Sequence, residues 1–158
     1  MFKLSDDLVL EYLAEASDQL ATMEADLLAM EEAGAEIDEE QVNRIFRAVH
    51  SIKGGAGFFD LAKIGELAHH AEDVLALIRS RKMAPTPDVV CVLLRTTDRL
   101  NELVKSPDTS NEADIAELIA RASRAAHGSP GLRPEELRSR DWPGTSSPRR
   151  SAGADRRR

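Results

Sequence analysis

The chain has 158 residues, of which 31% are charged, and a formal net charge of −7 at pH 7. This length suits one domain of ordinary size. Its single cysteine, Cys91, excludes an intrachain disulfide and lies in an apolar stretch, so we expect a buried hydrophobe rather than a nucleophile. No apolar run could span a bilayer, and acidic residues stand where a signal peptide would be apolar, which together predict a cytoplasmic protein.

The charge is distributed unevenly along the chain. Residues 1–127 contain 13 Lys and Arg against 24 Asp and Glu, whereas residues 128–158 contain 8 Arg and 4 acidic residues. The second segment is otherwise rich in Pro, Gly and Ser, with too few apolar side chains to offset the entropy of ordering it. We therefore predict one folded domain over 1–127 and a disordered tail over 128–158. The acidic charge of the domain argues against nucleic acid as its partner.

Apolar residues recur three and four positions apart through most of the predicted domain, which indicates amphipathic helices. Ser5, Asp38, Asp60 and Thr86 each precede such a stripe and are suited to cap a helix, and Pro87 fits a first helical turn. The connections are short, so successive helices should be antiparallel neighbours. We expect an all-α fold, an antiparallel up-down four-helix bundle with a fifth C-terminal helix, built from residues 5–31, 38–59, 61–81, 87–105 and 112–127.

The second predicted helix carries a histidine beside an unusual group of glycines. His50 lies on the flank of the apolar seam, with Lys53 and Gly57 on the same side and Gly54 just beyond. Glycine in a helix costs roughly 1 kcal/mol relative to alanine, so three glycines within four positions need a reason beyond folding. Removing side chains beside His50 would let a partner reach its ring. The alternative is that the glycine-rich stretch is a loop where the helix ends.

The third predicted helix brings polar residues to the height of His50. His50 lies 10 residues before Asp60, while His69 and Glu72 follow it by 9 and 12, which places all three at nearly the same level at about 1.5 Å per residue. Glu72 also occupies the flank position that faces His50 in an antiparallel pair. A carboxylate that accepts the Nδ1 proton leaves Nε2 free as a nucleophile, and Lys53 could neutralise a phosphoryl group there, with His69 as a second donor.

The sequence contains neither a nucleotide-binding loop of the Gly-Lys-Ser/Thr type nor an evident carboxylate cluster for Mg²⁺. The chain would therefore accept a phosphoryl group but would depend on another domain to cleave ATP. We expect a phosphoacceptor without a bound cofactor, and not a kinase by itself.

The segment His50-Ser-Ile-Lys-Gly-Gly-Ala-Gly57, followed by Leu67-Ala-His-His-Ala-Glu72, resembles the signature of histidine phosphotransfer (HPt) domains. Within that family it specifically resembles the N-terminal domains of the CheA-type chemotaxis histidine kinases, and the resemblance covers residues 5 to about 127. It implies a five-helix domain in which the ATP-binding domain of a histidine kinase phosphorylates His50. The receiver domain of a response regulator would then take the phosphoryl group on an aspartate.

By motif position, the resemblance implies that Glu72 is the hydrogen-bond partner of His50 and that Lys53 and His69 are supporting groups. Gly54 would provide clearance for the partner. One departure is Asp60, which stands where many relatives have a glycine. No ATP-binding, dimerisation or receptor-coupling domain follows the predicted domain, so the chain reads either as a stand-alone carrier or as the front piece of a longer kinase.

Two other readings stay open at this point. His50, His69 and Glu72 could hold a metal, although no fourth ligand is evident and His70 projects from the opposite flank. The chain could also be a purely structural interaction bundle with a surface histidine. The glycines and the matched Glu72 argue against this second reading, and we predict no metal.

Overall fold

The computed structural model describes residues 6–33, 36 and 38–127. All regular secondary structure in these residues is helical: α1 (Asp6–Ala33), α2 (Glu39–Phe58), α3 (Ala62–Arg79), α4 (Pro87–Lys105), α5 (Pro107–Ser110) and α6 (Ala116–His127). The predicted tail and the predicted cap Ser5 lie outside the described residues. None of the helices in the described part is long and apolar enough to cross a membrane.

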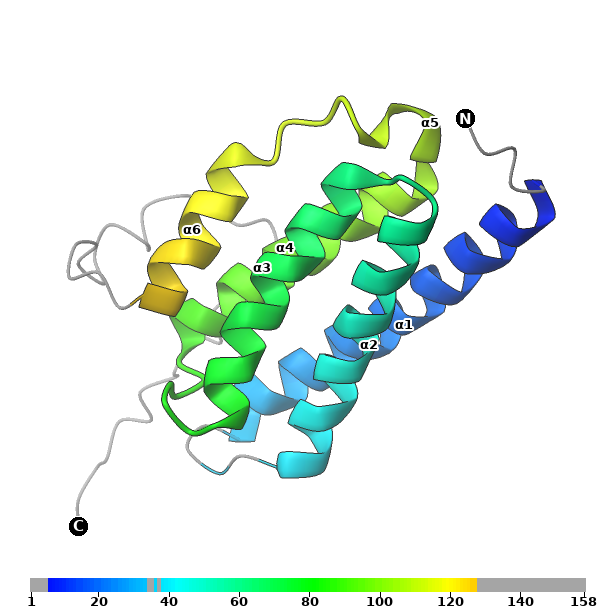
Figure 1. Cartoon of the computed structure of the whole chain (residues 1–158). Helices are drawn as coiled ribbons and strands as arrows, with labels where there is room; N and C mark the ends of the chain where they lie inside the picture. The colour runs from blue at the N-terminus through cyan, green and yellow to red at the C-terminus, as the bar shows by residue number, and fades with distance from the viewer. Residues whose placement is uncertain (1–5, 34–35, 37, 128–158) are drawn as a thin grey trace, which may run out of the picture.

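The first four helices form a closed bundle, and α6 packs against its side. α1 contacts α2 and α4, α3 contacts the same two helices, and α6 contacts α3 and α4 (Figure 1). The predicted four-helix bundle with an additional C-terminal helix is therefore confirmed. The most extensive contact joins α2 to α3, the two helices to which the predicted site residues belong.

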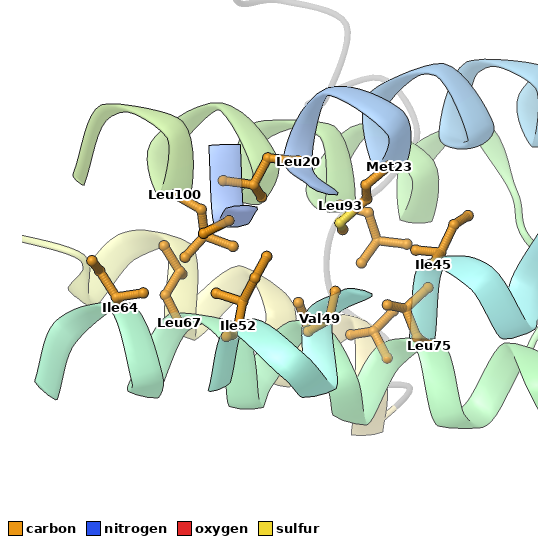
Figure 2. Close-up of a cluster of buried hydrophobic side chains, with 14 of the residues drawn as sticks. Leu20, Met23, Ile45, Val49, Ile52, Ile64, Leu67, Leu75, Leu93 and Leu100 are labelled. Atoms are coloured by element: carbon orange, nitrogen blue, oxygen red, sulfur yellow. The ribbon is translucent and has the colours of Figure 1, made fainter. Parts of the chain in front are cut away.

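The apolar stripes of the helices meet in one core. Figure 2 shows side chains from the first four helices pointing into this core, among them Leu20, Val49, Leu67 and Leu93. The buried seam of α2 consists of Val42, Ile45, Val49, Ile52 and Ala56. Burying these side chains fixes how α2 is rotated about its axis, because each apolar group removed from water stabilises that orientation. The residue after Val49 is thereby placed at the surface.

Two of the predicted helix caps are confirmed. The Asp38 carboxylate accepts a hydrogen bond from the Glu40 amide at 3.0 Å. The Thr86 hydroxyl accepts one from the Val89 amide at 3.4 Å, with Pro87 in the first turn of α4. Each bond satisfies an amide that has no partner within its own helix.

The prediction that Asp60 caps α3 is wrong. The N-cap residue is Leu61, and its side chain makes no capping bond. Asp60 instead has a φ of 58°, in the left-handed region that glycine adopts most easily, and so turns the chain from α2 into α3. The missing cap is supplied from the loop before α6, because the Asn111 side chain accepts from the Lys63 amide at 3.4 Å and donates to the Asp60 carbonyl at 3.0 Å.

The prediction that Cys91 is buried is also wrong. Cys91 is an exposed free cysteine on α4, whose buried stripe includes its neighbour Val90 and then Leu93. Consecutive residues of a helix point in different directions around its axis, and only one face of α4 is buried. Some members of an unbroken apolar run must therefore face outward.

The fifth predicted helix exists but begins at Ala116, whose amide is bonded to the Asp114 carboxylate at 3.1 Å.

Candidate functional site

The predicted contact between His50 and Glu72 is present. The imidazole Nδ1 of His50 lies 2.9 Å from Oε2 of Glu72, so a residue of α2 is bonded to one of α3. The two residues follow the buried positions Val49 and Ala71 directly, which places both on the same flank of the helix pair. The His50 side chain is 65% exposed, whereas that of Glu72 is only 15% exposed. The ring is thus accessible while its partner is held in place.

Lys53 completes the arrangement from one turn further along α2. Its Nζ donates to Oε1 of Glu72 at 2.8 Å, so the two oxygens of one carboxylate bind two different groups of α2. The Lys53 side chain is 29% exposed. Its positive charge stands within one helical turn of His50, where it would favour the presence of a phosphoryl group.

The pKa of the Glu72 carboxyl reflects this environment. Partial burial raises the pKa, but the hydrogen bonds and charges of Lys53 and His50 outweigh burial and lower the pKa below its ordinary value. Glu72 is therefore a carboxylate at neutral pH and can only accept hydrogen bonds. The proton in the bond to neutral His50 must sit on Nδ1, which leaves the lone pair on Nε2.

His69 is on the same helix as Glu72 but does not join this arrangement. Its Nε2 lies 3.7 Å from Oδ2 of Asp73, and its ring centroid lies 5.9 Å from that of His70. Within the described part of the chain, no hydrogen bond, ion pair or ring contact links His69 to His50. A supporting role for His69 therefore stays a prediction. His70 points to the other flank, as expected, with Nδ1 3.5 Å from the hydroxyl of Ser123 on α6.

The three glycines of the predicted site all lie within α2, so the reading of this stretch as a loop is wrong. A Cβ atom added at Gly54 or Gly57 would meet nothing within 4 Å. A Cβ at Gly55 would lie 2.1 Å from Cε2 of Tyr12. Among the residues that the structure describes, packing therefore requires glycine at position 55 alone, while Gly54 and Gly57 leave bare surface near Lys53.

Two further residues, which the sequence did not single out, extend the site: Phe46 stacks on the His50 ring, and Arg79 contacts Phe46. The Phe46 ring lies nearly parallel to the imidazole, with an interplanar angle of 11° and 6.2 Å between centroids. The guanidinium carbon of Arg79 stands 3.8 Å from the centroid of the same Phe46 ring. The spacing of four between Phe46 and His50 is the signal that could have shown the first contact.

The reading of the site as a metal centre loses its geometric support. In the part of the chain that the structure describes, no group of three or more His, Cys, Asp or Glu side chains is arranged to hold a metal ion. Both oxygens of Glu72 are occupied by His50 and Lys53.

Residues 7–106 match the family model of the Hpt domain. This chain belongs to the Hpt domain family. Among curated proteins, this Hpt chain is 38% identical over 120 residues to chemotaxis protein CheA of Rhizobium meliloti, an alignment that covers 74% of the chain and 16% of that protein. It is also 38% identical over 115 residues to CheA of Salmonella typhimurium, covering 72% of the chain and 17% of the relative. The chain thus spans about a sixth of the length of these relatives.

A solved structure resembles the Hpt fold of this chain over nearly the whole length of the solved chain. It is the phosphorylated P1 domain of CheA3 in complex with CheY6 from R. sphaeroides, with a TM-score of 0.66 and 28% sequence identity. The match covers 78% of this chain and 99% of that one.

Proposed function

We propose that this Hpt domain is a phosphocarrier of chemotaxis-type two-component signalling. In this proposal His50 accepts a phosphoryl group from ATP, delivered by the ATP-binding domain of a histidine kinase. It then passes the group to an aspartate in the receiver domain of a response regulator. The observation that carries the proposal is the bond between Nδ1 of His50 and Glu72, on a ring that is 65% exposed. The CheA relatives and the phosphorylated P1 domain bound to CheY6 support the chemotaxis assignment.

The geometry suits the first transfer. The Nε2 lone pair of neutral His50 attacks the γ-phosphorus of ATP, a P–N bond forms, and the bond from phosphorus to the bridging oxygen breaks to release ADP. The product is an imidazolium that keeps its proton on Nδ1, where the Glu72 carboxylate stabilises the positive charge. Lys53 reduces the repulsion between that carboxylate and the incoming phosphoryl group.

The second transfer reverses the bond changes at nitrogen. A carboxylate oxygen of the regulator attacks the phosphorus, the P–N bond breaks, and its electron pair returns to Nε2. The partner must approach His50 closely for this in-line displacement. The open surface at Gly54 and Gly57 suits such an approach, because neither position has neighbouring atoms that explain a glycine.

The partners that this function requires are a kinase ATP-binding domain as donor and a receiver domain as acceptor. No nucleic acid and no membrane insertion enter the reaction, and the chain needs no cofactor of its own. Because ATP-dependent signalling to a response regulator takes place inside the cell, we place the chain in the cytoplasm. Within the proposal, the same reaction serves a free-standing carrier or the first domain of a longer kinase.

A labelling experiment tests the proposal. The chain is incubated with γ-labelled ATP and the ATP-binding domain of a CheA-type kinase, and then with a receiver domain. Wild type should take up an acid-labile, base-stable label, as phosphohistidine does, and lose it to the receiver. His50→Gln should take up none while keeping its helical circular dichroism spectrum, and His70→Gln should label normally.

Two further results would contradict the proposal. Undiminished labelling of His50→Gln would show that another residue is the acceptor. A wild-type chain that takes no label from several CheA-type kinase domains would remove the phosphocarrier function. ATP without a kinase domain serves as the blank, since the proposal assigns the cleavage of ATP to the partner.

A further inference from the structure

The His50 ring needs more than one constraint to present Nε2 consistently. A single hydrogen bond from Nδ1 holds one point of the ring, and the side chain is 65% exposed. An imidazole held at one point can still rotate out of the plane that favours attack. Exposed side chains change rotamer on the picosecond to nanosecond timescale unless a neighbour prevents it. A second contact, on the face of the ring, would limit this rotation.

Phe46 supplies such a contact from one turn earlier in α2. Its ring is nearly parallel to the imidazole, at an angle of 11° and a centroid distance of 6.2 Å. Side chains four residues apart on a helix are neighbours, and offset parallel rings within about 7 Å attract one another. Phe46 itself is only partly exposed and packs against the hydrophobic core, so its ring is held more firmly than the imidazole is.

Arg79 fixes the Phe46 ring from the neighbouring helix. Its guanidinium carbon lies 3.8 Å from the ring centroid, within the range of a cation–π interaction. Arg79 is the last residue of α3, the helix that also carries Glu72. Two contacts between α2 and α3 therefore constrain the surroundings of His50: its own bond to Glu72, and the contact of its neighbour Phe46 with Arg79.

We propose that Phe46 is a positioning residue for phosphoryl transfer, held in place by Arg79, and that it keeps the His50 imidazole in the plane where Nδ1 meets Glu72 and Nε2 faces outward. This inference rests on the proposed function, and it deepens that function by adding a second support to the reactive ring. Phe46 and Arg79 act through His50 and are not assigned a contact with the phosphoryl group.

Two phosphoryl donors separate positioning from partner docking. One is labelled ATP with a kinase ATP-binding domain, and the other is phosphoramidate, a small molecule whose P–N bond breaks to release ammonia as His50 attacks. Phe46→Leu keeps an apolar side chain but removes the ring, and it should slow transfer from both donors by about three- to tenfold. Phe46→Tyr should transfer from both donors at rates within about twofold of wild type, because it keeps the ring. Slowing with the kinase alone would overturn the proposal, since it would make Phe46 a docking contact.

Matched controls are available on the same two helices. Phe58 is an exposed phenylalanine of α2, 67% exposed, and Phe58→Leu should leave the phosphoramidate rate unchanged. Arg79→Gln should slow transfer in the same direction as Phe46→Leu. Arg81→Gln, which removes only the exposed ion pair with Glu39, should not. An Arg79→Gln chain with the wild-type rate would overturn the role of Arg79.

A measurement on the unphosphorylated chain keeps this inference separate from the proposed function. Long-range nitrogen–proton NMR of the His50 ring reports which nitrogen carries the proton in the neutral imidazole. Wild type and Phe46→Tyr should be mainly in the Nδ1–H form, and Phe46→Leu should shift toward Nε2–H. An unchanged ratio in Phe46→Leu would overturn the positioning role. If the kinase failed to label wild type, the proposed function would be contradicted, but the tautomer ratio measured by NMR would still test the positioning role of Phe46.

Discussion

The ring of Tyr12 occupies the space that a side chain at Gly55 would need. A Cβ atom at position 55 would lie 2.1 Å from Cε2 of Tyr12, much closer than two carbon atoms can approach. Tyr12 cannot move away easily, because its hydroxyl donates to the Ile52 carbonyl at 2.7 Å and its ring centroid lies 5.1 Å from that of Phe59. Burial also raises the pKa of Tyr12 to about 12, so this hydroxyl keeps its proton at neutral pH.

Neighbouring glycines should therefore respond in opposite ways to the same substitution. Gly55→Ala should lower the free energy of unfolding by about 1–3 kcal/mol, because the Tyr12 ring must be displaced. Gly54→Ala has open space around the new methyl group and should raise it by up to about 1 kcal/mol through helix propensity. Urea denaturation of both variants measures the difference.

Gly54→Ala, the more stable of these two variants, should be less active. Gly54→Ala should slow transfer to the receiver domain, because the new methyl group stands on surface that the proposal leaves for the partner. The double variant Gly55→Ala with Tyr12→Leu serves as control and should recover part of the stability lost in Gly55→Ala. Equal losses of unfolding free energy in Gly54→Ala and Gly55→Ala would contradict the conclusion that only Gly55 is packed against Tyr12.

Glu72 and Lys53 should contribute to different stages of the reaction. Glu72→Ala should slow phosphorylation by about ten- to a hundredfold, roughly 1.4–2.8 kcal/mol of barrier, because the reactive tautomer is no longer held. Lys53→Ala removes a positive charge near the phosphoryl group and should lower the equilibrium yield of phosphohistidine modestly, since the His50 ring that carries this group is exposed to solvent. Initial rates and end-points of labelling separate the two effects, with circular dichroism as the folding control. An unchanged rate in Glu72→Ala would remove Glu72 from the reaction.

The lowered pKa of Glu72 predicts how its contribution to stability depends on pH. Because this carboxyl is more acidic in the folded chain, its contacts stabilise the fold fully above the ordinary pKa of glutamic acid. That contribution is lost as the pH falls through the lowered pKa of the folded state, where the carboxyl takes up a proton. Wild type should exceed Glu72→Gln in unfolding free energy at neutral pH, and the gap should close in acid. A gap that widens on acidification would show that the sign of the shift is wrong.

Asn111 should matter for stability and not for phosphoryl transfer. Its side chain donates to the Asp60 carbonyl and accepts from the Lys63 amide, so it holds the left-handed turn between α2 and α3 from outside. Asn111→Ala should lower the free energy of unfolding by about 1 kcal/mol, as the loss of a helix cap does. Its initial rate of kinase labelling should match wild type, and the exposed neighbour Glu112 provides a control in Glu112→Ala. A labelling defect as large as that of Glu72→Ala would instead connect this turn to the site.

The pairing of His50 with Glu72 could be predicted from helical periodicity and residue spacing. The seam through Val49 sets which way α2 faces, and a short connection between two long helices permits only an antiparallel neighbour. Counting residues from the turn then places Glu72 opposite His50, because the rise per residue is constant in a helix. For the same reason, the order of the bundle and the rotation of its helices could be anticipated from the sequence alone.

Local sequence could not decide features that depend on a second segment of the chain. Asp60 has the chemistry of a cap, yet the cap comes from Asn111, 51 positions away. Gly54 and Gly55 are the same residue type in the same helix, and only the position of Tyr12 makes one necessary and leaves the other open.

The spacing of four between Phe46 and His50 could be read from the sequence, but Arg79 reaches that ring only through the packing of α2 against α3. The sequence by itself determined the helices, their apolar faces and the level at which His50 meets Glu72, because these follow from periodicity along one chain. The tertiary structure decided which side chains surround the site, since contacts between helices depend on how two helices pack. The residue pattern along one helix does not specify that packing.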